Sequence, residues 1–477
     1  MKKNKKISLF LIIFMVSCML CLLTFFHLDA DYFWHIQAGD YMFHHGVLTY
    51  DVFSWFVKGK YWMSHEWLFE IILYFFKLLF GNLHVIIFCL FCLLGLFLCL
   101  FLPNQKKYLK NIPFTLVYFL FFFLIGLVFI QARPHMLSNV FLAFTIYVLY
   151  DLYKKEDSRK IYFLPFISIL WANVHGGSSN LPYLLCLLFL FGGIFSFQFH
   201  KIEAKRLTSK QIQKYLITMI LCMVCVCINI HGVKMFLYPY QNMLNSRMIQ
   251  NIQEWKATSL GEPYHIVYFL FLLFLIGIIL ISDKKIDWMD FLLFGFFAFL
   301  GLKSIRFWFY TFIAMNYIIF AYVKARPVER GTCLMLGCFS AFLILFFFSQ
   351  FSSLKSISYT NSLSEEMIQT IQKEHPDRLF NMYDLGGELI YHSIDVFIDG
   401  RADLYSDYNY ADYLDIIQLK SGYQDKLLQY DFDYFLVTDT CPLYSYLVLE
   451  DNQYSLVYHD AHIYFFQKRK ELVSSEA

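Results

Sequence analysis

Acidic and histidine side chains gather in a short segment near the N-terminus, and these residue types can move protons or hold a metal ion. Asp29 and Asp31 directly follow a long apolar run. In a helix that begins there, Asp31 and His35 share one face. A carboxylate beside an apolar run predicts a general base, or a ligand for a divalent cation such as Mg²⁺ or Mn²⁺ held by Asp29 and Asp31. The alternative is that Asp29 only caps the following helix.

His65 and Glu66 form a second group of this kind. Glu66 would add a second catalytic carboxylate, and His65 would contact a phosphate or a metal. The alternative for Glu66 is that its charge stabilises the positive N-terminus of the helix that follows. Both interpretations fit the sequence.

Further polar side chains occur where later apolar runs end. Arg133 lies in one very short turn and Arg306 in another, and arginine can make bidentate contacts to phosphate. Glycines beside His175 and His231 would let a ligand approach the backbone. The alternatives are arginines that reach toward lipid headgroups and glycines that cap helices. The candidate substrate-binding residues are His35, His65, Arg133, His135, His175, His231, Glu254, Lys303, Arg306 and, in the C-terminal part, Arg401.

The composition indicates that a membrane protein positions these residues. Of 477 residues, 58% are hydrophobic, 56 are Phe and only 16% are charged, whereas a soluble domain carries roughly 25% charged residues. Disordered, collagen-like and disulfide-scaffold classes are excluded. The net charge of +2 gives no indication of nucleic-acid binding. Most cysteines lie inside apolar runs, and no pair has the setting of a zinc site.

About eleven apolar runs predict a polytopic α-helical membrane protein, because most of them can cross about 30 Å of hydrocarbon. The first run follows four lysines and is long for a signal peptide, so we expect an uncleaved anchor. The expected spans are 7–28, 83–102, 114–131, 135–151, 182–199, 215–230, 265–282, 288–302, 306–323 and 331–350, with 161–173 as a shorter one.

The distribution of lysine and arginine predicts the orientation. If residues 66–80, which end at Gly81, lie along the interface, one set of loops carries more than twice as many Lys and Arg as the other. The positive-inside rule then places the N-terminus in the cytoplasm and the C-terminus outside. We therefore expect a membrane domain over 1–350, with a first outer loop over 29–82, and a soluble extracytoplasmic domain over 351–477.

The C-terminal part predicts a small α/β domain. Short β-like runs alternate with helical patterns, which is typical of a mainly parallel sheet. Gly386-Gly387 and Asp399-Gly400-Arg401 follow two of these runs, at the strand ends where α/β sheets bind ligands. We expect these segments to dock the domain onto the membrane part or to contact an acceptor rather than to catalyse. The predicted strands are 379–382, 396–399, 432–438, 454–458 and 463–467, with helical patterns around 387–392 and 412–428.

The order of these motifs resembles a group of bacterial membrane proteins that are relatives of the GT-C glycosyltransferases. The resemblance covers most of the chain, and one departure is Ala30, where related proteins often have Pro. It is carried by Asp29-Ala-Asp31-Tyr-Phe-Trp-His35-Ile-x-x-Gly39, Asp51-x-Phe53-Ser54, His65-Glu66-Trp67-Leu68, Arg133-Pro134, His175-Gly176-Gly177, Glu254-Trp255, Gly386-Gly387 and Asp399-Gly400-Arg401.

The resemblance implies a multi-span enzyme of the bacterial plasma membrane with a GT-C-like fold. Such enzymes transfer a sugar from a polyprenyl phosphate or pyrophosphate to an acceptor outside the cytoplasm. Asp31 or Asp29 would activate the acceptor or bind a metal, and Arg133 and Arg306 are candidates for the lipid phosphate by their chemistry. The implied partners are the polyprenyl-linked sugar donor, membrane lipids and a glycan, lipid or protein acceptor.

Three other functions fit parts of the sequence. A polysaccharide polymerase or ligase shares nearly all of these features. A transporter or flippase for lipid-linked saccharides would carry internal repeats and polar residues at the bilayer midplane, which the sequence does not display. A non-catalytic assembly factor would not depend on the carboxylates of Asp29 and Asp31.

Overall fold

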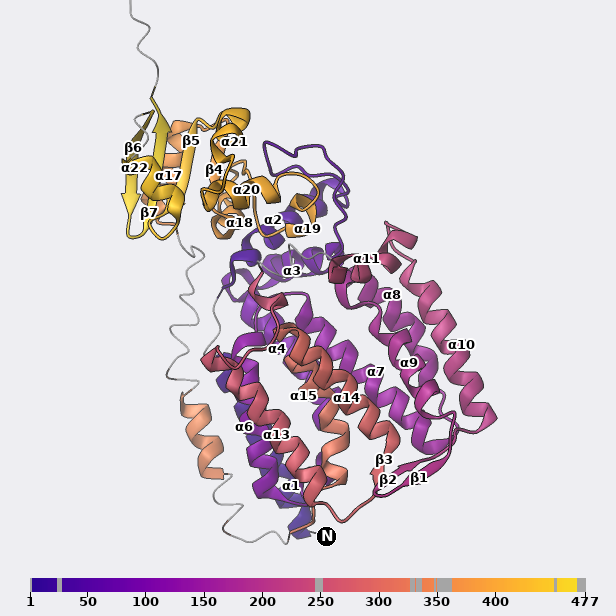
Figure 1. The fold of residues 1–477 in the computed structure, drawn as a ribbon. Helices are drawn as coiled ribbons and strands as arrows, with labels where there is room; N and C mark the ends of the chain where they lie inside the picture. The colour runs from indigo at the N-terminus through magenta and orange to yellow at the C-terminus, as the bar shows by residue number, and fades with distance from the viewer. Residues whose placement is uncertain are drawn as a thin grey trace, which may run out of the picture. The chain divides into compact units, whose positions relative to one another are not determined.

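The computed structural model describes residues 2–23, 28–244, 252–326, 331, 337–346, 349, 363–449 and 453–469 (Figure 1). By their internal contacts, the residues divide into two compact units. We call residues 1–27 and 76–357 the helical unit, and residues 28–75 and 358–477 the mixed unit. The first outer loop therefore belongs to the same compact unit as the C-terminal domain, whereas the sequence pattern groups it with the membrane domain.

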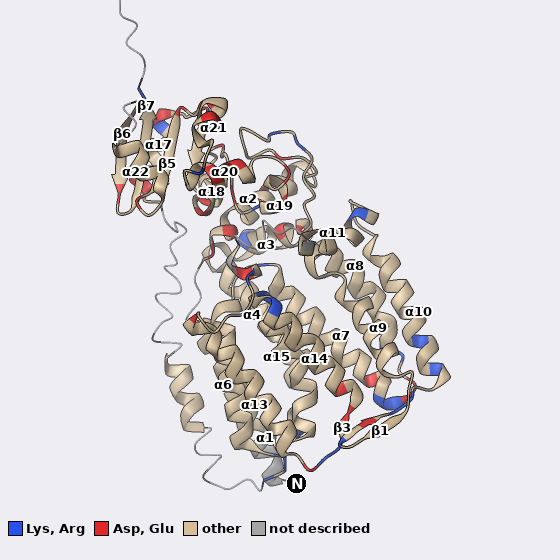
Figure 2. Ribbon diagram, viewed as in Figure 1, with Lys and Arg blue, Asp and Glu red and all other residues tan. Residues whose placement is uncertain are grey.

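The helical unit consists mostly of apolar helices, whose backbone groups bond within each helix as a lipid environment requires. Its charged residues lie mainly at helix ends and in connecting segments (Figure 2). The helices are α1 (Lys2–Leu23), α4 (His84–Leu96), α5 (Gln105–Tyr108), α6 (Ile112–Phe129), α7 (His135–Lys155), α8 (Leu164–Val174), α9 (Leu181–Gly192), α10 (Ser209–Val226), α11 (Val233–Leu244), α13 (Ile266–Ile281), α14 (Trp288–Lys303) and α15 (Trp308–Ile318).

Short helical turns join several of these elements. They are η1 (Gly81–Leu83), η2 (Phe97–Phe101), η3 (Lys160–Phe163), η4 (Gly176–Ser178), η5 (Gln253–Trp255), η6 (Pro263–His265), η7 (Ile305–Phe307) and η8 (Ile319–Ala321). Proline at the first turn favours the start of α6, α8 and α9, because its missing N–H has no partner there in any case.

Four helices among the described residues are long and apolar enough to cross a membrane, which makes the chain a membrane protein. They are Trp67–Phe101, Ile112–Phe129, His135–Lys155 and Pro263–Ile281, and shorter apolar helices cover Leu9–Leu23, Lys160–Val174, Gly176–Gly192, Ile305–Ala321 and Gly337–Phe346. The first of these runs is interrupted at Gly81, where φ is +52° and α3 (Trp67–Phe80) has ended. Eleven spans and the orientation remain predictions.

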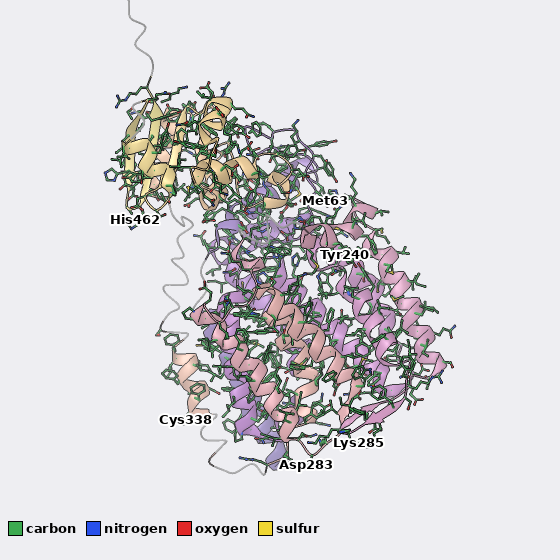
Figure 3. All side chains as sticks on the ribbon, viewed as in Figure 1. Met63, Tyr240, Asp283, Lys285, Cys338 and His462 are labelled. Carbon is green, nitrogen blue, oxygen red and sulfur yellow. The ribbon has the colours of Figure 1, made fainter. Side chains whose placement is uncertain are left out.

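The expected span 182–199 is wrong in its second half. Helix α9 ends at Gly192, and the next residue, Gly193, packs against Leu207 where a Cβ atom would collide with that side chain. The chain then forms β1 (Phe197–Phe199), which pairs antiparallel with β2 (Ile202–Ala204). Strand β3 (Ile286–Asp287) completes this small sheet in parallel with β2, next to Lys285 (Figure 3). The expected span 331–350 lies partly outside the described residues.

The mixed unit combines two segments of the chain around one sheet. Its elements are α2 (Ala30–His45), the first part of α3, α17 (Glu365–Glu374), β4 (Leu379–Asn381), α18 (Tyr383–Tyr391), α19 (Ala402–Tyr405), α20 (Tyr410–Ile417), α21 (Tyr423–Tyr430), β5 (Tyr434–Thr438), α22 (Pro442–Leu449), β6 (Tyr454–Asp460) and β7 (Ile463–Lys468). One hydrophobic core includes Trp34 and Trp62 of the first loop together with Phe380 and Phe435 of the sheet. The first loop is thus part of this folded unit.

The sheet of the mixed unit has the order β4-β5-β7-β6. Strands β4 and β5 are parallel, and the other two pairs are antiparallel. The prediction of a mainly parallel sheet is therefore wrong, because β6 and β7 are joined by a tight turn that permits only antiparallel pairing. Four of the five predicted strands are confirmed as β4, β5, β6 and β7.

The predicted strand 396–399 is wrong, and its hydrogen bonds show why. Val396 exchanges backbone hydrogen bonds with the first loop, accepting from Trp55 and donating to Phe53. The side-chain amide of Asn381 accepts from the N–H of Phe397 and donates to the carbonyl of Ile398. These backbone groups are satisfied by a loop and a side chain, so the segment does not join the sheet ladder.

Candidate functional site

The two aspartates of the D-x-D motif occupy the start of α2. The Asp29 side chain accepts a hydrogen bond of 2.8 Å from the backbone N–H of Asp31, so it caps the helix. The indole N–H of Trp34 donates to Oδ1 of Asp31 over 3.1 Å. Both carboxylates are partly exposed. Asp29 therefore makes the contact expected if it only caps the helix. Asp31 is held in a fixed orientation by Trp34 and is partly exposed.

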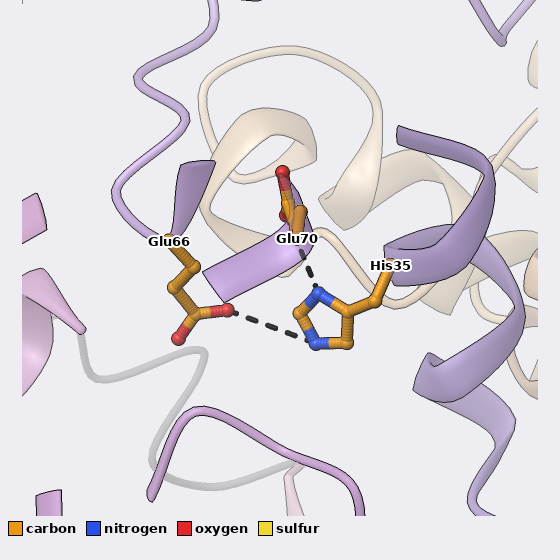
Figure 4. A group of neighbouring side chains, drawn as sticks. All are labelled: His35, Glu66 and Glu70. Atoms are coloured by element: carbon orange, nitrogen blue, oxygen red, sulfur yellow. Dashed lines mark hydrogen bonds and ion pairs between the residues drawn. The ribbon is translucent and has the colours of Figure 1, made fainter. Parts of the chain in front are cut away.

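A second group of side chains is buried between α2 and the start of α3. Nδ1 of His35 lies 3.3 Å from Oε1 of Glu70, and Nε2 lies 3.7 Å from Oε2 of Glu66 (Figure 4). The exposed fractions of His35, Glu66 and Glu70 are 2%, 7% and 0%. Each side chain has one potential metal-ligand atom, a ring nitrogen or a carboxylate oxygen, such that these three atoms lie within 4.8 Å of one another. This is the spacing of side chains that share one proton network or one metal ion.

Gly39 positions this group, because it lies one helical turn after His35 and faces α3. A Cβ atom at Gly39 would lie 2.8 Å from the carbonyl carbon of Glu70 and 3.0 Å from Cβ of Tyr74. Only glycine allows the two helices to approach this closely. The ring of Phe69 packs against the imidazole of His35 edge to face, at a centroid distance of 5.1 Å.

His65 extends the network to the C-terminal part of the mixed unit. Its Nε2 lies 3.2 Å from Oε1 of Glu66, and its Nδ1 lies 3.4 Å from Oδ2 of Asp403. Burial alone would lower the pKa of His65, but the carboxylates of Glu66 and Asp403 raise this pKa to about 10. His65 is therefore a cation at neutral pH, and its two nitrogens act as hydrogen-bond donors.

Arg401 lies in another buried network of the mixed unit, with its side chain fully enclosed. It donates from Nε to Oδ1 of Asp399 over 2.8 Å, from Nη2 to Oδ2 of Asp399 over 2.6 Å and from Nη1 to Oδ1 of Asp51 over 2.6 Å. The sequence pattern predicts a substrate contact for Arg401. The structure gives it a positioning role, in which it joins the Asp51 turn of the first loop to the Asp399-Gly400-Arg401 turn.

Asp51 is held as an ion by these contacts. Its Oδ2 accepts hydrogen bonds from the backbone N–H and the hydroxyl of Ser54, at 3.0 and 2.6 Å. Burial alone would raise the pKa of Asp51, but Arg401 and the Ser54 hydrogen bonds hold this pKa below its ordinary value of 3.8. The Asp51-x-Phe53-Ser54 motif is thus a turn that presents one carboxylate to Arg401.

Two glycines bring the C-terminal segments against the start of α2, and a third packs these segments against each other. A Cβ atom at Gly400 would overlap the carboxylate of Asp31 and lie 2.8 Å from Nε1 of Trp34, and one at Gly387 would lie 2.5 Å from the carbonyl oxygen of Ala30. Gly386 makes a similar approach to the backbone of Asp399. These contacts favour the docking interpretation, and the partner of the docking is the first loop.

In the helical unit, Arg306 lies among polar and aromatic side chains. Its Nη2 donates to Nε2 of His175 over 2.6 Å, and its guanidinium lies 5.3 Å from the ring centroid of Trp255. Nδ1 of the buried His175 contacts Oγ of Ser138 at 2.6 Å, and the indole of Trp171 donates to the same Oγ over 2.9 Å. Because Arg306 can only donate, His175 accepts at Nε2 and donates from Nδ1.

The other predicted site residues of the helical unit differ in their contacts and in their exposure. Arg133 forms an ion pair with Glu254. Nε2 of His135 bonds to the carbonyl of Phe129 over 2.7 Å. His231 lies in a turn, where its backbone N–H donates to Asn229, and Lys303 is exposed at the end of α14.

Four acidic members of the buried networks, Asp51, Glu70, Asp399 and Asp403, were not among the predicted site residues, although Asp51 and Asp399 lie in the motifs that carry the resemblance. Glu70 is the single acidic residue of the apolar helix α3 and lies one turn after Glu66, and an ionisable residue in such a run signals a partner or a function. Asp403 closes the motif that begins at Asp399, but nothing in the sequence connects it with His65.

No family model and no curated protein matches the chain. Among solved structures, the chain is similar to the oligosaccharyltransferase of Archaeoglobus fulgidus in its apo form, with a TM-score of 0.48, and to the same enzyme tethered by a disulfide bond to an acceptor peptide with the NVT sequon, with a TM-score of 0.46. Each comparison has 10% sequence identity and covers 90% of this chain and 69% of the other. Likenesses of this degree transfer no residue role to this chain.

Proposed function

We propose that the protein is a glycosyltransferase that moves a sugar from a polyprenyl phosphate or pyrophosphate donor to an acceptor outside the cytoplasm. The observation that carries this proposal is Asp31, a partly exposed carboxylate that Trp34 holds in one orientation beside the turn at Gly400. A carboxylate fixed in this way can take the proton of an attacking hydroxyl or amide. The apolar helices support a donor that is carried on a lipid.

The cations of the helical unit suit the phosphate of such a donor. Arg133 is paired with the carboxylate of Glu254, and a phosphate presents the same arrangement of acceptor oxygens, so it competes for the same donors. Arg306 is oriented by His175 and supported by the face of Trp255. Preorganised guanidinium groups stabilise the negative charge that develops on a departing phosphate.

The buried network of the mixed unit supports the site rather than touching the sugar. Arg401 fixes the turn that carries Gly400, and Gly400 packs against Asp31 and Trp34. Such supporting contacts keep a catalytic carboxylate within the narrow range of positions that a displacement reaction needs. Glu66 and His65 belong to this support, since both are held by neighbouring side chains.

Native mass spectrometry of the purified protein tests the proposal. Wild type is expected to carry spent polyprenyl phosphate, whereas Asp31→Asn is expected to retain the intact lipid-linked saccharide, whose mass identifies the sugar. Asp40→Asn is the matched control, because Asp40 lies on the same helix and pairs with the exposed His44. It should behave like wild type.

Two outcomes would contradict the proposal. Intact donor on wild type and Asp31→Asn alike, with no transfer to any acceptor, would favour a flippase. Full function in cells after neutralising both Asp29 and Asp31, with normal folding, would favour a non-catalytic assembly factor.

A further inference from the structure

Glu70 is a buried carboxyl group of the mixed unit whose described side-chain contacts are long. Its side chain is fully buried, and its described hydrogen bonds are two long ones, to Nδ1 of His35 at 3.3 Å and to Oγ of Ser64 at 3.5 Å. The imidazole of His35 lies between the carboxyl groups of Glu70 and Glu66, and His65 contacts Glu66 from the other side. A buried carboxylate with so few short contacts is costly unless a further positive group binds it.

The three side chains have the composition of a metal site. An imidazole nitrogen and two carboxylate oxygens lie within 4.8 Å of one another, and the two glutamates occupy adjacent turns on either side of the start of α3. Two ligand atoms at about 2.0–2.2 Å from one ion lie at most about 4.4 Å apart, so binding would draw these side chains slightly closer together. Phe69 packs against the imidazole, so apolar groups surround the site as they do around many bound metals.

The D-x-D motif fits a metal less well. The Asp29 carboxylate is used as a helix cap, and Oδ1 of Asp31 accepts the Trp34 indole. Among the described residues, neither aspartate belongs to a group of three His, Cys, Asp or Glu side chains whose spacing suits a metal ion. The metal that the sequence pattern assigns to Asp29 and Asp31 therefore has a better set of ligands elsewhere in the same unit.

We propose that His35, Glu66 and Glu70 bind one transition-metal dication, with Zn²⁺ or Mn²⁺ preferred over Mg²⁺ and Ca²⁺. An imidazole ligand favours transition metals, whereas Mg²⁺ and Ca²⁺ prefer sites made of oxygen alone. His65 is not part of the ligand set, because its two ring nitrogens already contact the carboxylates of Glu66 and Asp403. The bound ion links α2 to α3 and stabilises the mixed unit, and its binding does not depend on the transfer reaction proposed above.

Metal analysis of the purified full-length protein tests this site. The protein is stripped with EDTA, dialysed against Zn²⁺ or Mn²⁺, and measured for bound metal and for thermal unfolding. Wild type is expected to bind about one ion per chain. It should unfold at a higher temperature with Zn²⁺ than with the same concentration of Mg²⁺, because a metal that binds only the folded protein stabilises it. Failure of wild type to bind either transition metal would overturn the proposal.

Variants locate the ion. Glu70→Gln and His35→Gln are expected to weaken binding by more than about 100-fold, since changes beyond the direct ligands already cost 10- to 100-fold. His44→Gln is the matched control, because His44 is exposed on the same helix and pairs with Asp40. It should bind like wild type. Undiminished binding by Glu70→Gln would contradict the site.

Two further measurements keep the test decisive if a ligand variant fails to fold. The double variant Asp29→Asn, Asp31→Asn is expected to keep the ion, and its loss there would place the metal at the D-x-D motif. The absorption spectrum of Co²⁺ in folded wild type is expected to indicate a nitrogen and oxygen ligand set. A spectrum of fully hydrated octahedral Co²⁺ would overturn the proposal.

Discussion

Two buried ionic networks of the mixed unit differ in how well their carboxylates are satisfied. Around Arg401, one guanidinium meets Asp51 and Asp399 through bonds of 2.6–2.8 Å, and Ser54 and Tyr405 add short hydrogen bonds. Around His35, the two glutamates lie at 3.3 and 3.7 Å. Each network places one nitrogen-bearing side chain between two acidic ones.

The difference lies in the number and length of hydrogen bonds to the carboxylates. A network whose acceptors are all served by nearby donors fixes the backbone around it and has no need of a ligand. A network with long contacts leaves part of the desolvation cost uncompensated, and a bound cation can remove that cost. The Arg401 network is therefore a structural joint, whereas the His35 network is the better candidate for binding.

Replacing Arg401 is expected to have the largest effect. Arg401→Met leaves Asp51 and Asp399 buried without their cation, which costs about 3–5 kcal/mol in the free energy of unfolding. Thermal unfolding of the purified protein in detergent measures this loss. In metal-free protein, His35→Gln should lower the free energy of unfolding clearly less than Arg401→Met does. An equal loss in the two variants would contradict the distinction between the two networks.

Asp51→Asn is expected to cost about 2–3 kcal/mol at neutral pH, because a charge-assisted hydrogen bond to Arg401 is lost. The pKa of Asp51 is lower in the folded protein than its ordinary value of 3.8. Its contribution is therefore complete above that value and disappears as the pH falls through the lower folded pKa. The unfolding temperature of wild type minus that of Asp51→Asn should thus be constant from pH 7 to 5 and shrink below about pH 4. If the difference were already lost between pH 7 and pH 5, the lowered pKa of Asp51 would be contradicted.

Gly39→Ala sharpens the comparison from the side of the His35 network. The added methyl group forces α2 away from the backbone of Glu70, at a cost of about 1–3 kcal/mol. It should also weaken metal binding, because the distance from His35 to Glu70 increases. Gly277→Ala in α13 is the control, since nothing lies within 4 Å of its Cβ position. Equal unfolding temperatures for Gly39→Ala and wild type would mean that the helices are not in close contact there.

Trp34→Phe is expected to have the smallest effect on stability, about 1 kcal/mol, because it removes the single hydrogen bond to Asp31 and keeps most of the ring. Transfer activity should fall much more than stability, since Asp31 loses its fixed orientation. Comparing kcat with the unfolding temperature separates the two effects. A parallel decrease of both would assign Trp34 to packing alone.

Much of the local structure could be predicted from the sequence. Apolar runs gave the helices, and alternating patterns gave four strands of the C-terminal sheet. The errors arise where a distant segment competes for the backbone. Residues 396–399 have a β-like pattern, but Phe53 and Trp55 of the first loop and the Asn381 side chain take their hydrogen bonds. No local pattern contains that information.

The same limit applies to the candidate site. The residue types and spacing of Asp31, His35, His65 and Glu66 marked the first loop as the place for chemistry. The contact of His65 with Asp403, and the meeting of His35 with Glu70, depend on how segments far apart in the chain pack together. Arg401 has the chemistry of a phosphate ligand, and only its burial between Asp51 and Asp399 reveals its positioning role.

The sequence by itself determined that this is a membrane protein with many apolar helices, an acidic first loop and a polar C-terminal part, because composition and short-range periodicity carry those properties. The tertiary structure decided that the first loop and the C-terminal sheet share one core, that Gly39 brings α2 against α3, and that Gly387 and Gly400 bring the C-terminal segments against the start of α2. The physical reason is that a glycine permits close approach wherever it occurs, but the segment that makes the approach is selected by packing over the whole unit.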